Sequence, residues 1–586
     1  MSSLAEKLSQ HVGLVFKSCD LPEELGRVQV SDRPDLAQFQ CNGAMAAAKI
    51  AKKAPRDIAN DIVSKLKEDE SLSKVDIAGP GFINLDVTDT FIAQHMASLW
   101  HDERLGVKPV AAGQTMILDY GGPNVAKPMH VGHLRASIIG DTLRRICSFM
   151  GYETLGDVHM GDWGTHMGMI ISEYIATGRE DEVLNVDLED RAAVAALMNQ
   201  LSDLYPQVSG KCKEDPERLA LAQDATVKIQ NKDPQHFRLW EKIRNASIIG
   251  MRENFARLNV HFDLWKGEAD VHDYIAPMVQ QLKDDSFAEK DQGALIVRVA
   301  NDDDDKEIPP LILYKRDGAV MYGTTDMATL VERVKLYNPD KVVYIVDQRQ
   351  HLHFVQVFRA VKKAGIVRDD VELTHAGFGT MNGPDGKPFK TRAGGVMKLE
   401  DLISEATDKA LQRLDEAALA QDMSDDEKNE VAHSVAISAI KFADLQNQRQ
   451  SDYIFDLDRF ARFEGKTGPY LLYQAVRIQS LLAKAQTEGV EPSGAFVIED
   501  VDRPLALLLT EMPDVFELCL KSYAPHHLCE YAYRLAQEFS RFYGSCHILS
   551  EDNQALKESR LGLCVLALRQ ITLILDCLGI DIPKRM

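Results

Sequence analysis

The spacing of apolar residues changes several times along the chain, and each change marks a different kind of element. Residues 115–120, TMILDY, are almost continuously apolar, which indicates a strand buried in a parallel sheet. Residues 134–150 place apolar side chains at helical spacing and are followed by Gly151, so they predict a helix. The runs at 341–347 and 371–379 predict further strands. Strands alternating with helices are typical of a doubly wound α/β domain.

The segments on either side of this region have other patterns. Residues 1–108 mix helical and strand periods, and within them 74–87, KVDIAGPGFINLDV, predicts two strands around a Gly-Pro-Gly turn. From 401 to 586 the pattern is almost wholly helical. The sequence therefore predicts an N-terminal α+β domain at 1–108, an α/β domain at 109–400 with an acidic helical insertion at about 180–250, and an all-α region at 401–586.

Composition narrows the class of protein. A chain of 586 residues is too long to fold around one hydrophobic core, so several domains are expected. Its net charge of -22 repels polyanions, so a nucleic-acid partner would need a locally basic face on the protein. Nine scattered cysteines without a C-x-x-C pair indicate reduced thiols in a cytoplasmic protein, with no structural zinc. The apolar run at 561–579 contains Arg569 and Asp576, so we interpret it as a buried helix and expect no membrane partner. The charged run at 301–307, NDDDDKE, predicts a solvated turn.

A phosphate-handling site is indicated at 121–141, GGPNVAKPMHVGHLRASIIGD, between the first strand and its helix. His130 and His133 lie at the start of that helix, where backbone N–H groups and the helix dipole favour anions. Gly132 lacks a side chain, so a flat ring such as adenine can approach the backbone, while Lys127 adds a positive charge. Such donors stabilise charge on a phosphorus atom under attack, which indicates nucleotidyl transfer.

Two further positions have polar groups suited to ligand recognition. Tyr322 and Asp326 are four residues apart, so they share one face if 322–330 opens a helix capped by Thr324 or Thr325. A carboxylate beside an aromatic ring suits a guanidinium group. Gln350 follows the strand at 341–347, and its amide can bond an ammonium or a carboxylate without titrating.

The stretch DVHMGDWGTH, residues 157–166, leaves two interpretations open. It contains four residues of metal-ligand type, as a metal-dependent phosphoesterase would use: Asp157, His159, Asp162 and His166. Gly161 and Gly164 instead favour a close-packed turn beside the site.

Taken together, these motifs resemble those of the arginyl-tRNA synthetases. HVGH looks like the first signature of class I aminoacyl-tRNA synthetases, and further similar stretches follow in order: HMGDWGTHMG (159–168), YGTTDMATL (322–330), VDQRQHLHF (346–354), GKPFKTRAGG (386–395) and FEGKTGPYLLYQAVRI (463–478). The resemblance runs from GPGFIN near residue 79 to the terminal IDIPKRM, so it covers essentially the whole chain.

The resemblance implies a Rossmann-like class I catalytic domain, an N-terminal additional tRNA-binding domain and a C-terminal anticodon-binding bundle. It implies ATP-dependent activation of L-arginine to arginyl-adenylate, with Mg²⁺ accompanying ATP, and transfer to the 3′ end of tRNA(Arg). The family expectation is a monomer. Two alternatives stay open: another nucleotidylyltransferase with a His-x-Gly-His site, or a non-catalytic tRNA-binding paralogue.

The resemblance also implies residue roles. The loop at 386–395 stands where the class has Lys-Met-Ser-Lys-Ser, and Lys127 compensates for a lysine missing from it. The implied catalytic residues are Lys127, His130, His133 and Lys390, and the ATP-binding residues are His130, Gly132, His133, Lys387, Lys390 and Thr391. The implied arginine-binding residues are Asp119, Asn124, His159, Tyr322, Asp326 and Gln350. For tRNA they are Arg449, Arg459, Lys466, Tyr470 and Tyr473, because cations with aromatic rings suit unpaired bases; we expect both tyrosines to be partly packed.

Overall fold

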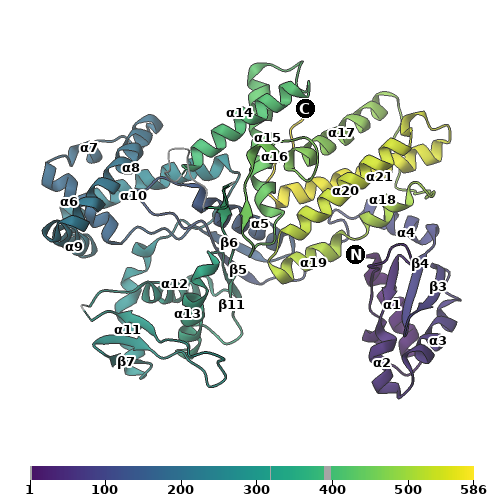
Figure 1. Ribbon diagram of the computed structural model, residues 1–586, viewed down its shortest axis with the longest axis horizontal. Coiled ribbons are helices and arrows are strands. Elements are labelled where there is room, and N and C mark those ends of the chain that lie inside the picture. Colours follow the sequence, from purple (N-terminus) through teal and green to yellow (C-terminus); the bar gives the residue numbers. More distant parts are fainter. Residues whose placement is uncertain (1–2, 317, 384, 388–396) are drawn as a thin grey trace. The chain divides into compact units, whose positions relative to one another are not determined.

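The computed structural model describes residues 3–316, 318–383, 385–387 and 397–586 (Figure 1). They form two compact units. One comprises Met1–Val110, Phe463–Asp576 and Asp581–Met586, and the other comprises Ala111–Arg462 and Cys577–Ile580.

The second unit is built on a four-stranded parallel sheet with the order β11-β10-β5-β6. The strands are β5 (Thr115–Asp119), β6 (Glu153–Asp157), β10 (Lys341–Tyr344) and β11 (Glu372–His375). Three of them were predicted from their apolar runs, and these predictions are confirmed. Helix α5 (Leu134–Phe149) connects β5 to β6, α12 (Tyr322–Tyr337) precedes β10, and α13 (His351–Lys363) connects β10 to β11.

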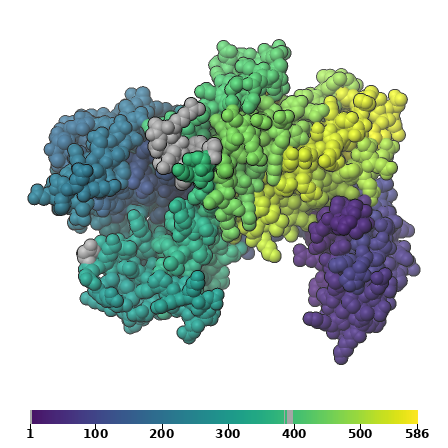
Figure 2. All heavy atoms as spheres, in the orientation of Figure 1, coloured from purple at the N-terminus to yellow at the C-terminus, as the bar shows by residue number. Residues whose placement is uncertain are grey.

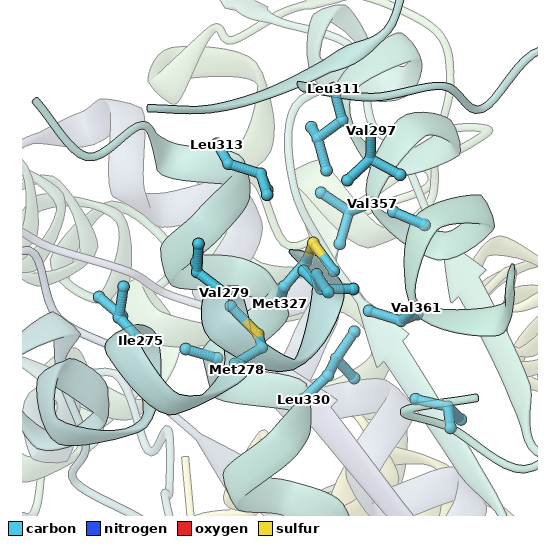
Figure 3. Close-up of a cluster of buried hydrophobic side chains, with 14 of the residues drawn as sticks. Ile275, Met278, Val279, Val297, Leu311, Leu313, Met327, Leu330, Val357 and Val361 are labelled. Atoms are coloured by element: carbon cyan, nitrogen blue, oxygen red, sulfur yellow. The ribbon is translucent and has the colours of Figure 1, made fainter. Parts of the chain in front are cut away.

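A small antiparallel sheet precedes α12 and was not predicted. It consists of β7 (Ala288–Asp291), β8 (Ala294–Val297) and β9 (Leu311–Tyr314). Figure 3 shows its apolar side chains in one buried cluster with those of α11 (His272–Asp284), α12 and α13. In this cluster Met327 and Leu330 of α12 contribute beside Val357 and Val361 of α13. The cluster also contains Ile117 of β5 and Val342 of β10, so it fixes both helices against the central strands of the parallel sheet.

The loop at 301–307 is the solvated turn that its charge predicted, since all its residues but Asp304 are exposed. Arg359 of α13 donates from both Nη atoms to the carboxylate of Asp304, at 2.6 Å each. This hydrogen bonding lowers the pKa of Asp304 to about 2. The predicted solvated turn is therefore confirmed, and one of its four aspartates also binds an arginine from a distant helix.

The segment predicted as an insertion at about 180–250 is helical, as its pattern indicated. It consists of α7 (Asp181–Leu184), α8 (Arg191–Glu214), α9 (Pro216–Gln230) and α10 (Pro234–Arg257), which form the blue lobe in Figure 2. Asp190, Asp215 and Asp233 precede the three long helices, and their carboxylates accept hydrogen bonds from first-turn N–H groups. The unit also contains α6 (Thr165–Thr177), α14 (Leu399–Glu416), α15 (Asp425–Leu445), α16 (Leu457–Phe460) and the short pair β12 (Met381–Asn382) and β13 (Tyr453–Ile454).

The first unit combines an α+β segment with a helical segment, as the sequence predicted. Its N-terminal part has the antiparallel sheet β1-β2-β4-β3, in which β3 and β4 enclose the predicted Gly-Pro-Gly turn. The elements are α1 (Leu4–Lys17), β1 (Val28–Val30), β2 (Phe39–Cys41), α2 (Gly43–Ala51), α3 (Pro55–Leu66), β3 (Leu72–Ala78), β4 (Phe82–Val87) and α4 (Asp89–Trp100).

The helical part of this unit starts at α17 (Gly468–Thr487). It continues with α18 (Arg503–Leu509), α19 (Met512–Ser522), α20 (His526–Ser545) and α21 (Gln554–Cys577). Among the helices of the described residues, none has the length and apolar character needed to cross a membrane.

Candidate active site

The histidine signature forms a short 3-10 turn, η2 (Val131–His133), that continues into α5. The Nδ1 atom of His130 accepts from the backbone N–H of Gly132 at 3.0 Å, and Nδ1 of His133 accepts from the N–H of His130 at 3.2 Å. Because each Nδ1 is an acceptor, each neutral ring has its proton on Nε2. A Cβ atom on Gly132 would lie only 2.7 Å from Cε1 of His130, so a side chain here would displace the His130 ring. The turn thus holds two rings whose Nε2–H groups are available as donors.

Both histidines are neutral near pH 7. Burial lowers the pKa of His133 to about 3, and the neighbouring His130 contributes to this shift. Burial also lowers the pKa of His130, with a smaller contribution from the charge of Lys127. The signature therefore offers neutral hydrogen-bond donors, and Lys127 supplies the permanent positive charge.

The segment that follows the predicted basic loop pairs with the histidine signature. Val131 donates its backbone N–H to Met397 O at 3.1 Å, and Leu399 donates to Met129 O at 3.0 Å. Lys387 is exposed on the other side of the loop. Lys390 and Thr391 lie outside the described residues. The chain at 397–399 is consequently beside the signature.

The carboxyl ends of the four strands present a row of polar residues. The register aligns Asp157, Asp119, Tyr344 and His375 across the sheet. Arg333 of α12 lies over this row with its side chain 1% exposed. Its Nη2 atom donates to Asp119 Oδ2 at 2.5 Å and to Asp157 Oδ2 at 2.6 Å, and its guanidinium lies 5.2 Å from the centre of the Tyr344 ring. Arg333 therefore compensates two buried carboxylates at once.

The pKa values of the titratable residues in and beside this row are shifted in different directions. Burial raises the pKa of Asp119, even though Arg333 acts in the opposite direction. Burial also opposes ionisation of Asp157, but Arg333 and His159 outweigh it and hold the pKa of Asp157 well below its usual range. Burial alone would lower the pKa of His159, yet Asp157 and Asp119 raise it to about 9. His159 is therefore a buried cation at neutral pH, and its Nε2 lies 3.3 Å from Thr329 Oγ1.

One face of α12 carries the predicted guanidinium-binding pair. Tyr322 and Asp326 are one turn apart, and Thr329 and Arg333 continue the same face toward the sheet. Asp326 Oδ2 lies 2.5 Å from Nε2 of His353 on α13, and Tyr322 is 73% exposed. Asp326 thus combines a fixed orientation with access to a ligand.

The predicted threonine cap of α12 is wrong. The helix already begins at Tyr322, after Met321, and has no side-chain cap. Thr324 is buried instead, and its hydroxyl donates to Leu313 O of β9 at 2.7 Å. The tertiary contact with the small sheet decided the role of this threonine.

Sequence reasoning missed Glu268, the first residue of the 3-10 turn η3 (Glu268–Val271). Burial raises the pKa of its carboxyl to about 7, and the charges of Asp162 and Asp326 add to the shift while His159 opposes it. Glu268 is therefore within electrostatic range of Asp326 and His159, and its protonation is poised near neutral pH. No sequence pattern marks it, because the end of the insertion brings it to the site. Arg333 was detectable, since it lies two turns beyond Asp326 on the same helical face.

The two predicted amides follow strand ends. Asn124 pairs with Gly161 in an isolated bridge, and a Cβ atom on Gly161 would lie 2.4 Å from Asn124 Oδ1. This contact supports the close-packed turn predicted around Gly161. Gln350 ends the 3-10 turn η4 (Gln348–Gln350) after β10. Asn124 and Gln350 are both exposed.

The metal-site interpretation of 157–166 is not supported. Asp162 is bound by Nε of Arg244 at 2.7 Å and by the N–H of Ala269 at 2.9 Å. Among the described residues, the one group with metal-ligand spacing is Asp119, Asp157 and His159. Arg333 already pairs with both carboxylates of this group.

The predicted RNA-binding residues are divided between the two units. Arg449 and Arg459 belong to the second unit, where the guanidinium of Arg449 donates to Gly377 O and Arg459 is exposed beside the Phe460 ring. Arg449 thus has an internal structural contact, which the sequence did not indicate.

The other three belong to the first unit. Lys466 pairs with Glu530 at 2.5 Å, and the ring of Tyr470 lies 5.9 Å from that of Tyr533. Tyr470 and Tyr473 are both half-buried, which confirms the expected packing.

The parallel sheet, the His-x-Gly-His turn and the helical segments define a class I aminoacyl-tRNA synthetase. A family model described as "tRNA synthetases class I (R), catalytic domain" matches residues 95–457. The chain belongs to the arginyl-tRNA synthetase family, because the arginine–tRNA ligases of Alkaliphilus oremlandii and Maricaulis maris are 44% and 45% identical to it over the full length of both chains.

The flanking segments and a solved structure agree with this membership. Residues 2–87 match an arginyl-tRNA synthetase N-terminal domain, and 471–586 match the DALR anticodon binding domain. The crystal structure of arginyl-tRNA synthetase from Plasmodium falciparum superposes with a TM-score of 0.82 at 26% identity, covering both chains completely.

Proposed function

We propose that this chain is an arginine–tRNA ligase that first activates L-arginine with ATP. The arginine carboxylate attacks the α-phosphorus of ATP, and the bond between this phosphorus and the oxygen that bridges to the β-phosphate breaks. Arginyl-adenylate forms, and pyrophosphate is released. The 3′-terminal ribose hydroxyl of tRNA(Arg) then attacks the arginyl carbonyl, and AMP leaves. The observation that carries the proposal is the face of α12, where Asp326 is held by His353 and lies near Glu268.

The first step uses the histidine turn. The Nε2–H groups of His130 and His133 donate to phosphate oxygens, and Gly132 gives the nucleotide access to the backbone. Lys127 stabilises charge that develops on the phosphates, with Lys387, Lys390 and Thr391 acting from the loop at 386–395. Neutral donors aimed at a developing charge need no reorganisation during the reaction. We assign Mg²⁺ to the oxygens of ATP itself, since Arg333 and His159 disfavour a cation at the buried acidic group.

Arginine binds at the carboxyl edge of the sheet. Asp326 and Glu268 bind the guanidinium through charge-assisted hydrogen bonds, and the Tyr322 ring packs on its plane. Asp119, with Oδ2 held by Arg333, presents its second oxygen to the same group. Three residues complete the site, with the amides serving the ammonium and carboxylate ends: Asn124, His159 and Gln350. A cation pocket of this kind discriminates by paired charge, so no editing domain is needed.

The remaining segments serve tRNA. We assign the N-terminal segment to the outer corner of tRNA and the helical C-terminal segment to the anticodon. The residues we assign to RNA contacts are Arg459, Lys466, Tyr470 and Tyr473. Arg449 is excluded from this set because its guanidinium is engaged by Gly377 O.

The decisive experiment is aminoacylation of total tRNA with each amino acid in turn, together with ATP–pyrophosphate exchange measured with and without tRNA. We expect arginine alone to be attached, and exchange to require tRNA, as in the family. Exchange with another amino acid and none with arginine would refute the proposal. Tight tRNA binding without any exchange would favour the non-catalytic alternative.

A further inference from the structure

The ammonium of Lys127 has an aromatic contact from the helical insertion. Its Nζ atom lies 4.2 Å from the centre of the Tyr205 ring on α8. Within the described part of the chain, Lys127 forms no ion pair with a carboxylate. The loop that carries the signature therefore contacts the insertion through a cation–π pair.

Tyr205 is held firmly enough to orient this ammonium. Its ring is half-buried, and its neighbours Leu201, Leu204 and Val208 are buried in the packing of α8. The carboxylate of Asp190 caps the start of the same helix. A ring on such a helix gives Lys127 a defined position, whereas a lone surface lysine samples many rotamers.

The chemistry of this partner is significant. A carboxylate would neutralise the ammonium and compete with an incoming phosphate, while an aromatic face attracts the cation without cancelling its charge. The lysine charge also lowers the pKa values of His130, His133 and His166, which places it near all three imidazoles while it lies on the ring. Lys127 is thus held where its charge remains available to an anion at the signature.

We propose that Tyr205 is a positioning residue for ATP activation: its ring holds the Lys127 ammonium beside the histidine signature, ready for the phosphates. This proposal rests on the proposed function, in which Lys127 acts on ATP. It gives the helical insertion a part in the first reaction step.

Steady-state ATP–pyrophosphate exchange of the full chain, measured with tRNA(Arg) present, tests the proposal. Tyr205→Leu removes the ring and should raise the KM for ATP about 5-fold, within the range of a cation–π pair, while the KM for arginine changes less than about 2-fold. Tyr205→Phe keeps the ring face and should restore the wild-type KM. Tyr274→Leu is the matched control, because Tyr274 lies under Lys335 with a ring distance of 5.2 Å elsewhere in the same unit. It should leave the KM for ATP unchanged.

A double-mutant cycle separates positioning from general packing. If the ring acts through Lys127, Tyr205→Leu should have no further effect on the KM for ATP in a Lys127→Met background. Independent, multiplying effects would overturn the proposal, and so would an unchanged or lowered KM in Tyr205→Leu. Should Tyr205→Leu unfold in thermal melts, Tyr205→Gln takes its place with the same expected rise.

The same measurements distinguish a failure of the Tyr205 proposal from a failure of the proposed function. If Lys127→Met changes neither kcat nor the KM for ATP, the role assigned to Lys127 is wrong and the Tyr205 proposal falls with it. If Lys127→Met raises the KM but Tyr205→Leu does not, the role of Lys127 stands and only the Tyr205 proposal is overturned. If the wild-type chain activates no arginine at all, the proposed function itself fails.

Discussion

Arg333→Met should strongly destabilise the parallel sheet of the second unit. The arginine is 1% exposed, and its two partners Asp119 and Asp157 are 13% and 2% exposed. Methionine fills similar volume but removes the cation that bonds both carboxylates, which leaves His159 as their neighbouring positive charge. Removing one partner from a buried ion pair costs about 3–5 kcal/mol, because the remaining charge is left uncompensated.

The loss is best measured by hydrogen–deuterium exchange, since a chain with several domains has no single unfolding free energy. Peptides covering β5, β6 and β10 should exchange roughly 10² to 10³ times faster in the variant, as 1.4 kcal/mol corresponds to about tenfold. The matched control is Arg349→Met, because Arg349 pairs with Asp347 at 2.6 Å but is 81% exposed. An exposed pair of this kind contributes about 0–1 kcal/mol.

A second variant isolates the cause. Adding Asp157→Asn to Arg333→Met removes one uncompensated charge, so protection of the sheet should partly return. Through Asp157 the wild-type sheet should lose stability in acid: the pKa of Asp157 is depressed, so its contribution is present above about pH 4, the unfolded value, and is lost as pH falls further. If Arg333→Met and Arg349→Met exchange at similar rates, the reasoning about this buried pair is refuted.

The remaining predictions concern the two substrates. Burial raises the pKa of Glu268 to about 7, so arginine binding should release a proton near neutral pH and should tighten from pH 6 to 8. Calorimetry in two buffers measures the proton release, and Glu268→Gln should abolish it. Arginine binding that does not depend on pH in the wild type would contradict this prediction. Asp326→Asn should raise the KM for arginine about 10-fold or more with little change for ATP, and equal effects on both would remove Asp326 from the guanidinium role. His133→Ala should slow adenylate formation about 10²-fold or more in single-turnover assays, with tRNA affinity retained. His261→Ala is the control, since His261 is 64% exposed. Unchanged turnover in His133→Ala would rule out the histidine site.

The longest and most apolar elements were readable from the sequence. Strand β5 and helix α5 have strong periods of their own, and the insertion has clear acidic caps. The small sheet β7-β8-β9 has strands of four residues interrupted by a charged loop, so local pattern could not identify it. Although its position suggested a cap for α12, Thr324 does not cap this helix, because its hydroxyl donates to Leu313 O of the same sheet.

The residues of the candidate site also differ in whether a local sequence pattern could identify them. Residues within one stretch, such as His130 and His133, were found because their function follows from the turn that they form. Glu268 has no motif, and His353 lies in the stretch at 346–354 without a role that the sequence indicates; tertiary packing around α12 brings both to the site. Lys390 belongs to the loop outside the described residues, so its role stays a prediction.

Helix α12 has a consequence for how specificity can change in this fold. The same helix bears Asp326, which faces the ligand, and Arg333, which compensates the carboxylates of two strands. Shifting the helix to admit a different side chain would move Arg333 off its partners and destabilise the sheet. A new specificity, whether evolved or engineered, must therefore come from exchanging side chains near the exposed first turn while the backbone of α12 stays in place.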